Sequence, residues 1–190
     1  YFENDSVVQA IANSLEKWYV RHKAFFLDTF ETRSPVLIYG NHPEFQQTRA
    51  TGGTISIGTQ AFAEALKNRI VMPILETNAQ MDHVIGHEVA HVFHFKVMFG
   101  NDTLSMSSMQ NIPLWLVEGM AEYFSIGSID THTAMIMRDA VHSEDGIPTL
   151  EDMTRDFRYN PYRFGHAFFA FFGRTWGDSL ITPLDRKSVV

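Results

Sequence analysis

Residues 81 to 97 read MDHVIGHEVAHVFHFKV, and this stretch decides how the rest of the chain is interpreted. Its apolar residues recur at the three- and four-residue spacings of an α-helix. They are Val84, Ile85, Val89, Val92, Phe93 and Val97. Gly100 follows as a stop signal, so we predict a helix from Met81 to about Gly100. Such a helix places His87 and His91, four positions apart, on one face.

Before this helix, three short apolar runs predict a small sheet. Residues 36–39 form an apolar run between Pro35 and Gly40, residues 54–58 alternate polar with apolar side chains, and residues 69–75 form a further run that contains Pro73. Helical periodicity is expected in the segments that flank the strands and follow residue 100. These segments are residues 6–30, as one long helix or two, a loop or short helix near 43–45, a short helix near 62–66, a helix from Pro113 to about Gly127, and two more near 131–142 and 160–176.

The order of these elements is a helix, a small mixed sheet and then a group of helices, which is an α+β pattern. With 190 residues and no repeat or low-complexity tract, the chain is expected to form a single domain over residues 1–190. Residues 101–111 are expected to form a loop. Because the chain begins at Tyr1 without an initiator methionine, we expect it to be part of a longer protein.

The composition restricts the partners that the chain can be expected to have. Its formal net charge of −7 argues against a nucleic-acid partner, because no basic stripe is available to displace counterions from phosphates. No stretch approaches the length of apolar sequence that spans a bilayer. The chain has no cysteine, so any metal must be held by histidines and carboxylates.

His87-Glu88-Val89-Ala90-His91 is an HExxH motif, a pattern typical of zinc hydrolases. Imidazoles one turn apart on a helix can both reach one tetrahedral ion at metal–nitrogen distances of about 2.0 to 2.1 Å. Glu88 is offset by about 100° around the helix. It is therefore expected to reach the water that the metal activates without binding the metal itself.

A second segment, residues 115–123, reads WLVEGMAEY on the helix that starts at Pro113. Together with HExxH, it resembles the gluzincin peptidases, most closely a thermolysin-like "peptidase MA" group of bacterial proteins. In that family the glutamate before the glycine is the third zinc ligand, which the resemblance assigns to Glu118. The acidic residue four positions later commonly accepts a hydrogen bond from a zinc-bound imidazole, and Glu122 occupies that place. A ligating histidine normally needs such an acceptor.

Two other histidines near the motif are alternative ligands, and a metzincin site is excluded. That class needs a glycine three residues after the second motif histidine and a third histidine three residues further on, whereas this chain has His94 and Val97 at those positions. His83 and His94 fall in the same helical stripe as His87 and His91. Glu118 has the better sequence context as the third ligand.

A third segment, Tyr162-Arg163-Phe164-Gly165, resembles the Y-x-x-G segment of gluzincin aminopeptidase-like enzymes. There the tyrosine donates a hydrogen bond to the oxyanion of the reaction, and this role maps onto Tyr162. Tyr159 and His166 are alternative donors. Residues 53–57 resemble the sheet edge on which these peptidases pair an extended substrate backbone.

The resemblance implies a zinc peptidase in which Zn²⁺ polarises the scissile carbonyl, Glu88 is the general base and Tyr162 stabilises the oxyanion. It implies a peptide or protein substrate, export to a bacterial periplasm or exterior, and a possible C-terminal partner domain. Two alternatives stay open. One is a catalytically silent zinc-containing binding or scaffold domain, and the other is a hydrolase of a non-peptide amide or ester.

Overall fold

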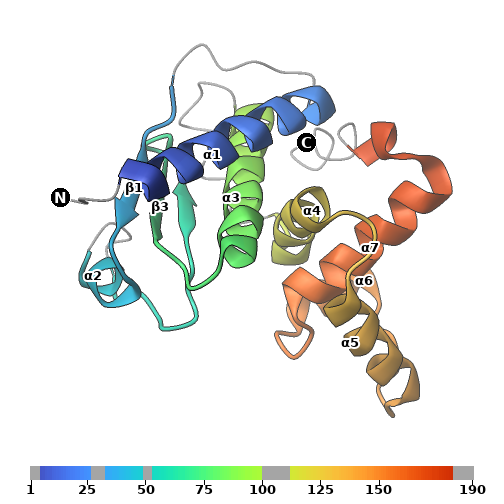
Figure 1. Cartoon of the computed structure of the whole chain (residues 1–190). Helices are drawn as coiled ribbons and strands as arrows, with labels where there is room; N and C mark the ends of the chain where they lie inside the picture. Colours follow the sequence, from blue (N-terminus) through green and yellow to red (C-terminus); the bar gives the residue numbers. More distant parts are fainter. Residues whose placement is uncertain (1–4, 27–32, 49–52, 100–111, 182–190) are drawn as a thin grey trace. The chain divides into compact units, whose positions relative to one another are not determined.

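The computed structural model of the chain describes residues 5–26, 33–48, 53–99 and 112–181. By its internal contacts the chain divides into two compact units, Tyr1–Phe93 and His94–Val190, and each is described here by itself. The expected α+β class is confirmed, because a small mixed sheet is followed by a series of helices (Figure 1). The assignment of residues 1–190 to one domain stays a prediction.

In its described residues, the first unit contains two long helices, one short helix and three strands. In chain order they are α1 (Asp5–Phe26), β1 (Val36–Tyr39), α2 (His42–Gln47), β2 (Phe62–Glu64), β3 (Arg69–Pro73) and α3 (Asn78–Phe99), of which the part up to Phe93 belongs to this unit. Within the described ranges, the helices expected over residues 6–30 and from Met81 are confirmed, and the segment near 43–45 is the short helix rather than the loop. The strands expected over 36–39 and 69–75 are also confirmed, the second as far as Pro73.

The three strands form one sheet in the order β1-β3-β2. β1 pairs in parallel with β3, with Val36 opposite Ile70, and β2 pairs antiparallel with β3, with Phe62 opposite Val71. Pro73 is the last residue of β3, where its missing N–H costs no bond in the ladder. Beside the sheet, Phe45 of α2 packs in a buried cluster with Ile55 and Val71.

The strand expected over residues 54–58 is wrong. The alternation there predicts that Ile55 and Ile57 share a buried face, but Ile55 is 7% exposed and Ile57 is 86% exposed. The backbone turns after Ile55, where the N–H of Thr59 donates to the carbonyl of Ser56 at 3.1 Å. The side-chain amide of Gln46 donates to the Ile55 carbonyl, so a side chain takes the place of a neighbouring strand.

The short helix expected near residues 62–66 is also wrong, because this segment supplies strand β2. A tight turn joins β2 to β3, with the N–H of Asn68 donating to the Ala65 carbonyl at 3.2 Å. Asn68 has a φ of 45°, in the left-handed region that asparagine tolerates better than most residues. The hairpin pairing therefore overrides the local helical spacing of this segment.

Helix α1 packs against α3 through contacts spread along the two helices (Figure 1). Asp82 accepts hydrogen bonds from Ser14, Lys17 and Trp18. At Gly86 the Trp18 indole lies so close that a Cβ would be 2.7 Å from its Cε2. Further along, the rings of Phe26 and Phe93 stack with centroids 5.3 Å apart. Glycine at position 86 thus permits the two helices to approach closely.

The second unit is helical throughout the described part. After the end of α3, its elements are α4 (Leu114–Ile126), α5 (Thr131–His142), α6 (Leu150–Arg155), α7 (Pro161–Trp176) and a 3₁₀ turn, η2 (Asp178–Leu180). The helices expected from Pro113 and near 131–142 and 160–176 are confirmed, although Pro113 caps α4 rather than starting it. Helix α6 was not predicted, and the loop expected over 101–111 lies outside the described residues.

Helices α4 and α7 cross with their backbones in contact. A Cβ added to Gly119 would lie 2.3 Å from the Gly165 backbone, and a Cβ on Gly165 would lie 2.2 Å from the Trp115 carbonyl oxygen. Beyond this crossing, the Tyr123 hydroxyl donates to Asp178 at 2.7 Å. Any side chain at either glycine would push the two helices apart.

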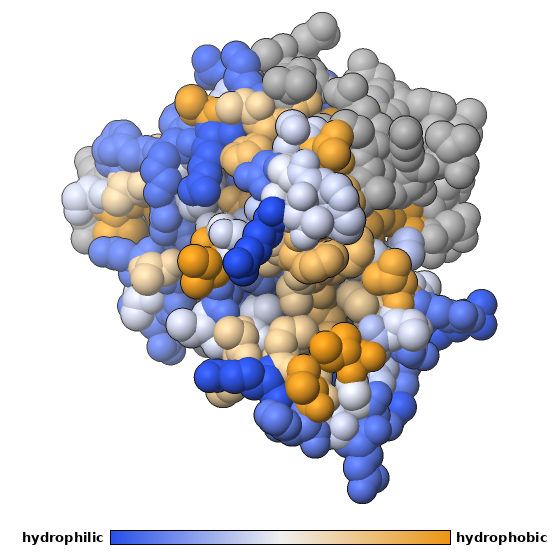
Figure 2. Space-filling model, turned by 90° about the vertical axis from the view of Figure 1, so that its right-hand side faces the viewer, coloured by the Kyte–Doolittle hydropathy of each residue, from blue (hydrophilic) through white to orange (hydrophobic). Residues whose placement is uncertain are grey.

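The surface of the second unit mixes exposed apolar side chains with charged ones. In Figure 2, orange and pale orange groups run through the middle of the face, with blue hydrophilic groups on either side. The most exposed large apolar residues of this unit include Ile129, Ile147 and Phe157. None of the helices in the described ranges combines the length and the apolar character needed to cross a bilayer.

The α4–α7 crossing predicts that Gly119→Ala destabilises the second unit. Alanine normally favours a helix by about 1 kcal/mol over glycine, but its methyl group would overlap the Gly165 backbone. Overpacking of this kind costs about 1 to 3 kcal/mol. Urea denaturation followed by circular dichroism measures the change. Gly53→Ala is the control, because a Cβ there meets nothing within 4 Å. Equal stability of both variants would contradict the observed crossing.

Burial of His22 predicts a loss of stability in mild acid. Burial lowers the pKa of this imidazole from 6.5 to about 4, while the hydrogen bond of its Nε2–H to the Gly86 carbonyl opposes that shift. The unfolded chain therefore takes up a proton before the folded one. Stability should fall as the pH drops from about 6.5 to about 4, by about 3 kcal/mol in total, and show no further loss from this group below that.

Urea denaturation of the metal-free protein between pH 7.5 and 4 measures this effect. His22→Gln keeps a donor for the Gly86 carbonyl but cannot titrate, so its stability should depend less on pH over this window. His142→Gln, which replaces an exposed histidine, should keep the wild-type dependence. Identical pH dependence in wild type and His22→Gln would rule out this source of acid sensitivity.

Candidate metal centre

The two motif histidines converge on one face of α3. The Nε2 atoms of His87 and His91 are 3.0 Å apart, and the rings are nearly perpendicular with centroids 4.6 Å apart. Each residue is only 7% exposed. The convergence follows from the four-residue spacing, which puts the two side chains one turn apart on the helix.

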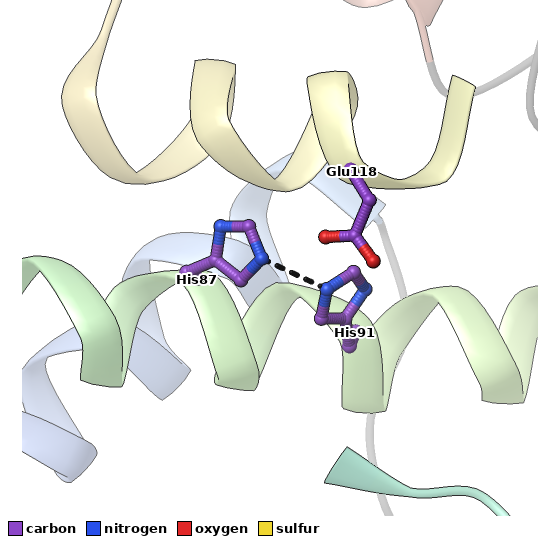
Figure 3. A group of neighbouring side chains, drawn as sticks. All are labelled: His87, His91 and Glu118. Atoms are coloured by element: carbon purple, nitrogen blue, oxygen red, sulfur yellow. Dashed lines mark hydrogen bonds between the residues drawn. The ribbon is translucent and has the colours of Figure 1, made fainter. Parts of the chain in front are cut away.

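The third member of this group is Glu118 of α4. One ligand atom from each of His87, His91 and Glu118 lies within 4.8 Å of the other two (Figure 3). In Figure 3 the carboxylate of Glu118 extends toward the His91 imidazole. The group could hold a metal ion, and it unites the three residues that the sequence analysis selects as ligands.

The donor set of this group suits zinc. Zinc takes imidazole nitrogen and carboxylate oxygen in tetrahedral sites, and two nitrogens about 2.0 to 2.1 Å from such an ion lie roughly 3.3 Å apart. The separation of 3.0 Å between the His87 and His91 nitrogens is close to this value. Within the described residues the group offers three protein ligands, and three is the number that catalytic zinc sites use, whereas structural sites use four. The residues therefore fit the expected Zn²⁺.

Glu88 is held inside the protein on the same helix. It is 6% exposed, between neighbours on α3 that are themselves buried. It is not a member of the metal-binding group, in keeping with its offset around the helix. Its role as a general base stays a prediction.

Glu122 forms a contact that the sequence analysis did not foresee. Its Oε2 lies 2.9 Å from Nη1 of Arg163, which comes from the first turn of α7. The same nitrogen is 3.2 Å from Oδ2 of Asp130. The expected hydrogen bond from a metal-bound imidazole to Glu122 stays a prediction. Sequence spacing carries no signal for the pair, because its partners are on different helices.

Asp130 has a second function beside its contact with Arg163, because it caps α5. Its side chain accepts a hydrogen bond from the Thr133 N–H at 2.7 Å. Burial acts to raise the pKa of this carboxyl, but the hydrogen bonds from Thr133 and the charge of Arg163 together hold the pKa below its usual value. Asp130 is therefore a carboxylate at neutral pH.

The three candidate oxyanion donors lie at or near the start of α7 and differ in their surroundings. Tyr162 is 38% exposed, and its backbone N–H donates to the capping side chain of Asn160. Tyr159 packs its ring against Phe164. His166 is buried, and its Nε2–H donates to the carbonyl of Gly127 at 2.8 Å. Of the three, Tyr162 is the most suited by exposure, and its role stays a prediction.

His83 and His94, the alternative ligands, are not members of the metal-binding group. Both lie on α3, where His94 is fully buried and the His83 ring lies 6.2 Å from that of His87. Within the described ranges, His87, His91 and Glu118 form the single set of three donors close enough to share an ion. This geometry favours Glu118 over either histidine as the third ligand.

The group predicts that replacing any one of His87, His91 or Glu118 by alanine weakens zinc binding by more than about 100-fold. Even partners that only support a metal ligand cost 10- to 100-fold when removed. Competition with a chromophoric chelator measures the affinity. His94→Gln and the surface variant His132→Ala should bind zinc as the wild type does. Loss of zinc from His94→Gln, with Glu118→Ala unaffected, would assign the third ligand to His94.

Comparison with protein-family models, with curated proteins and with solved structures gives no match to this chain.

Proposed function

We propose that the chain is a zinc-dependent hydrolase, and that its substrate is a peptide or protein. The observation that carries this proposal is the convergence of His87, His91 and Glu118, whose ligand atoms lie within 4.8 Å of one another. A buried carboxylate, Glu88, accompanies this group on α3. The resemblance of HExxH and WLVEGMAEY to the gluzincin peptidases supports the same reading.

Zinc bound to this group would act as a Lewis acid that polarises a carbonyl and makes water more acidic. Glu88 takes the proton of the attacking water and passes it to the leaving amine, as a general base and then a general acid. Its low exposure keeps it away from bulk solvent on the helix that carries both histidines.

Tyr162 is proposed to donate its hydroxyl hydrogen to the oxyanion that forms on the scissile carbonyl. Its position at the start of α7 is set by the Asn160 cap, whose side chain accepts from the backbone N–H groups of Tyr162 and Arg163. A donor held in place before the reaction stabilises the developing charge without reorganisation during it.

The decisive variant for this function is Glu88→Gln. Glutamine preserves the shape of the side chain but cannot accept the proton, so peptide cleavage should fall by about 10²- to 10⁴-fold. Zinc affinity should stay at the wild-type level, because Glu88 is not in the metal-binding group. Cleavage of a mixed library of unstructured peptides by the zinc-loaded protein, read by mass spectrometry, measures the effect and reveals the substrate preference.

Glu76→Gln is the matched control, since this glutamate is exposed two residues before α3 and should cleave peptides as the wild type does. Full activity of Glu88→Gln would refute the base assignment. Absence of cleavage by a wild-type protein that binds one zinc ion would shift the assignment to a binding or scaffold domain, or to a non-peptide amide.

A further inference from the structure

Arg163 joins three helices of the second unit through one guanidinium nitrogen. Its Nη1 is 2.9 Å from Oε2 of Glu122 on α4 and 3.2 Å from Oδ2 of Asp130, the residue that caps α5. Arg163 itself lies in the first turn of α7. One cation therefore contacts two carboxylates that are contributed by different elements of the chain.

The ion pair between Arg163 and Glu122 is buried, so its charges interact strongly. The side chains of Glu122 and Arg163 are 3% and 17% exposed, so solvent screens their charges weakly. Removing the cation would take away a charge partner from a buried carboxylate, and breaking a buried ion pair in this way is strongly destabilising. The ion pair therefore holds the Glu122 carboxylate next to the Arg163 guanidinium.

The position of Arg163 is itself fixed in two ways. Asn160 caps α7 and accepts a hydrogen bond from the Arg163 N–H at 3.2 Å. Two residues further on, Gly165 lies against Gly119 so closely that neither position can carry a Cβ. The backbone of α7 next to Arg163 is therefore in direct contact with α4, the helix that carries Glu122.

The place of Glu122 on α4 connects this contact to the metal-binding group. Glu122 follows Glu118 by four residues, so the two carboxylates lie one turn apart on the same face. Gly119 lies directly after Glu118, and the contact with Gly165 restrains the helix there. The ion pair and the glycine contact thus act on the same two turns of α4.

We propose that Arg163 is a positioning residue for the metal centre: its ion pair with Glu122 fixes that carboxylate and the turn of α4 that presents Glu118. The inference rests on the proposed function, because it takes Glu118 as a metal ligand. Arg163 does not touch the metal or the reacting atoms in this role. It acts through Glu122.

Zinc affinity of the full chain, measured by chelator competition, tests the proposal. Arg163→Met removes the charge at similar length and should weaken zinc binding by about 10- to 100-fold. Arg163→Lys keeps the charge but not the planar fork, so its loss should be smaller. Arg158→Met is the control: this arginine also pairs with two carboxylates, but it is 69% exposed, and zinc affinity should not change.

A double-variant cycle distinguishes action through Glu122 from a general structural effect. If Arg163 works by holding Glu122, then Arg163→Met combined with Glu122→Gln should bind zinc no more weakly than the weaker single variant. Losses that simply add would overturn the proposal. The visible spectrum of the cobalt-substituted protein gives a second readout, because it reports the ligand geometry and should change in Arg163→Met but not in Arg158→Met.

The outcomes separate this inference from the proposed peptidase. If the zinc affinities of the variants behave as this double-variant cycle predicts but the wild-type protein cleaves no peptide, the positioning role is upheld and the peptidase function is refuted. Folded Arg163→Met with wild-type zinc affinity and cobalt spectrum would overturn the positioning role and leave the peptidase standing. Should Arg163→Met fail to fold, unchanged affinity in Arg163→Lys and Glu122→Gln would overturn it equally. A wild-type protein that binds no zinc overturns both.

Discussion

The orientation of the histidine pair depends on the contact between α1 and α3 at Gly86. Trp18 occupies the space that a Cβ would need, and His22 donates to the Gly86 carbonyl, so α1 covers the face of α3 that carries this glycine. His87 follows Gly86 by one residue and is therefore rotated by about 100° away from that face. His91 lies one turn further along the same stripe. The packing of α1 thus determines which direction the two imidazoles take, before any metal is bound.

In the second unit, charged carboxylates lie on a helix, α4, that is mostly buried. On α4, Glu122 and its sequence neighbours Ala121, Tyr123 and Phe124 are all buried. A carboxylate in such surroundings is costly unless a cation or hydrogen-bond donors accompany it. Arg163 supplies the cation, and the Gly119–Gly165 contact brings its helix close enough to do so. Close packing and charge compensation are thus two parts of one arrangement.

The sequence predicts those parts of the fold that local periodicity controls. The helices around Glu88 and Glu118 follow from their apolar spacing, and the grouping of His87, His91 and Glu118 follows from motif spacing and family resemblance. Tertiary contacts decide the rest. The 54–58 segment alternates like a strand, yet only Ile55 is buried. Helix α6 carries a different signal, a capping box of Thr149 and Asp152, which apolar spacing does not reveal. The Arg163–Glu122 pair has no such signal, because it joins different helices.

The ion pair also bears on how Glu122 could serve a metal-bound imidazole. A carboxylate has two oxygens and about four acceptor sites, so it can accept from a guanidinium and from a histidine N–H at the same time. The contact of Oε2 with Arg163 and a hydrogen bond from a metal-bound imidazole are therefore compatible on one carboxylate.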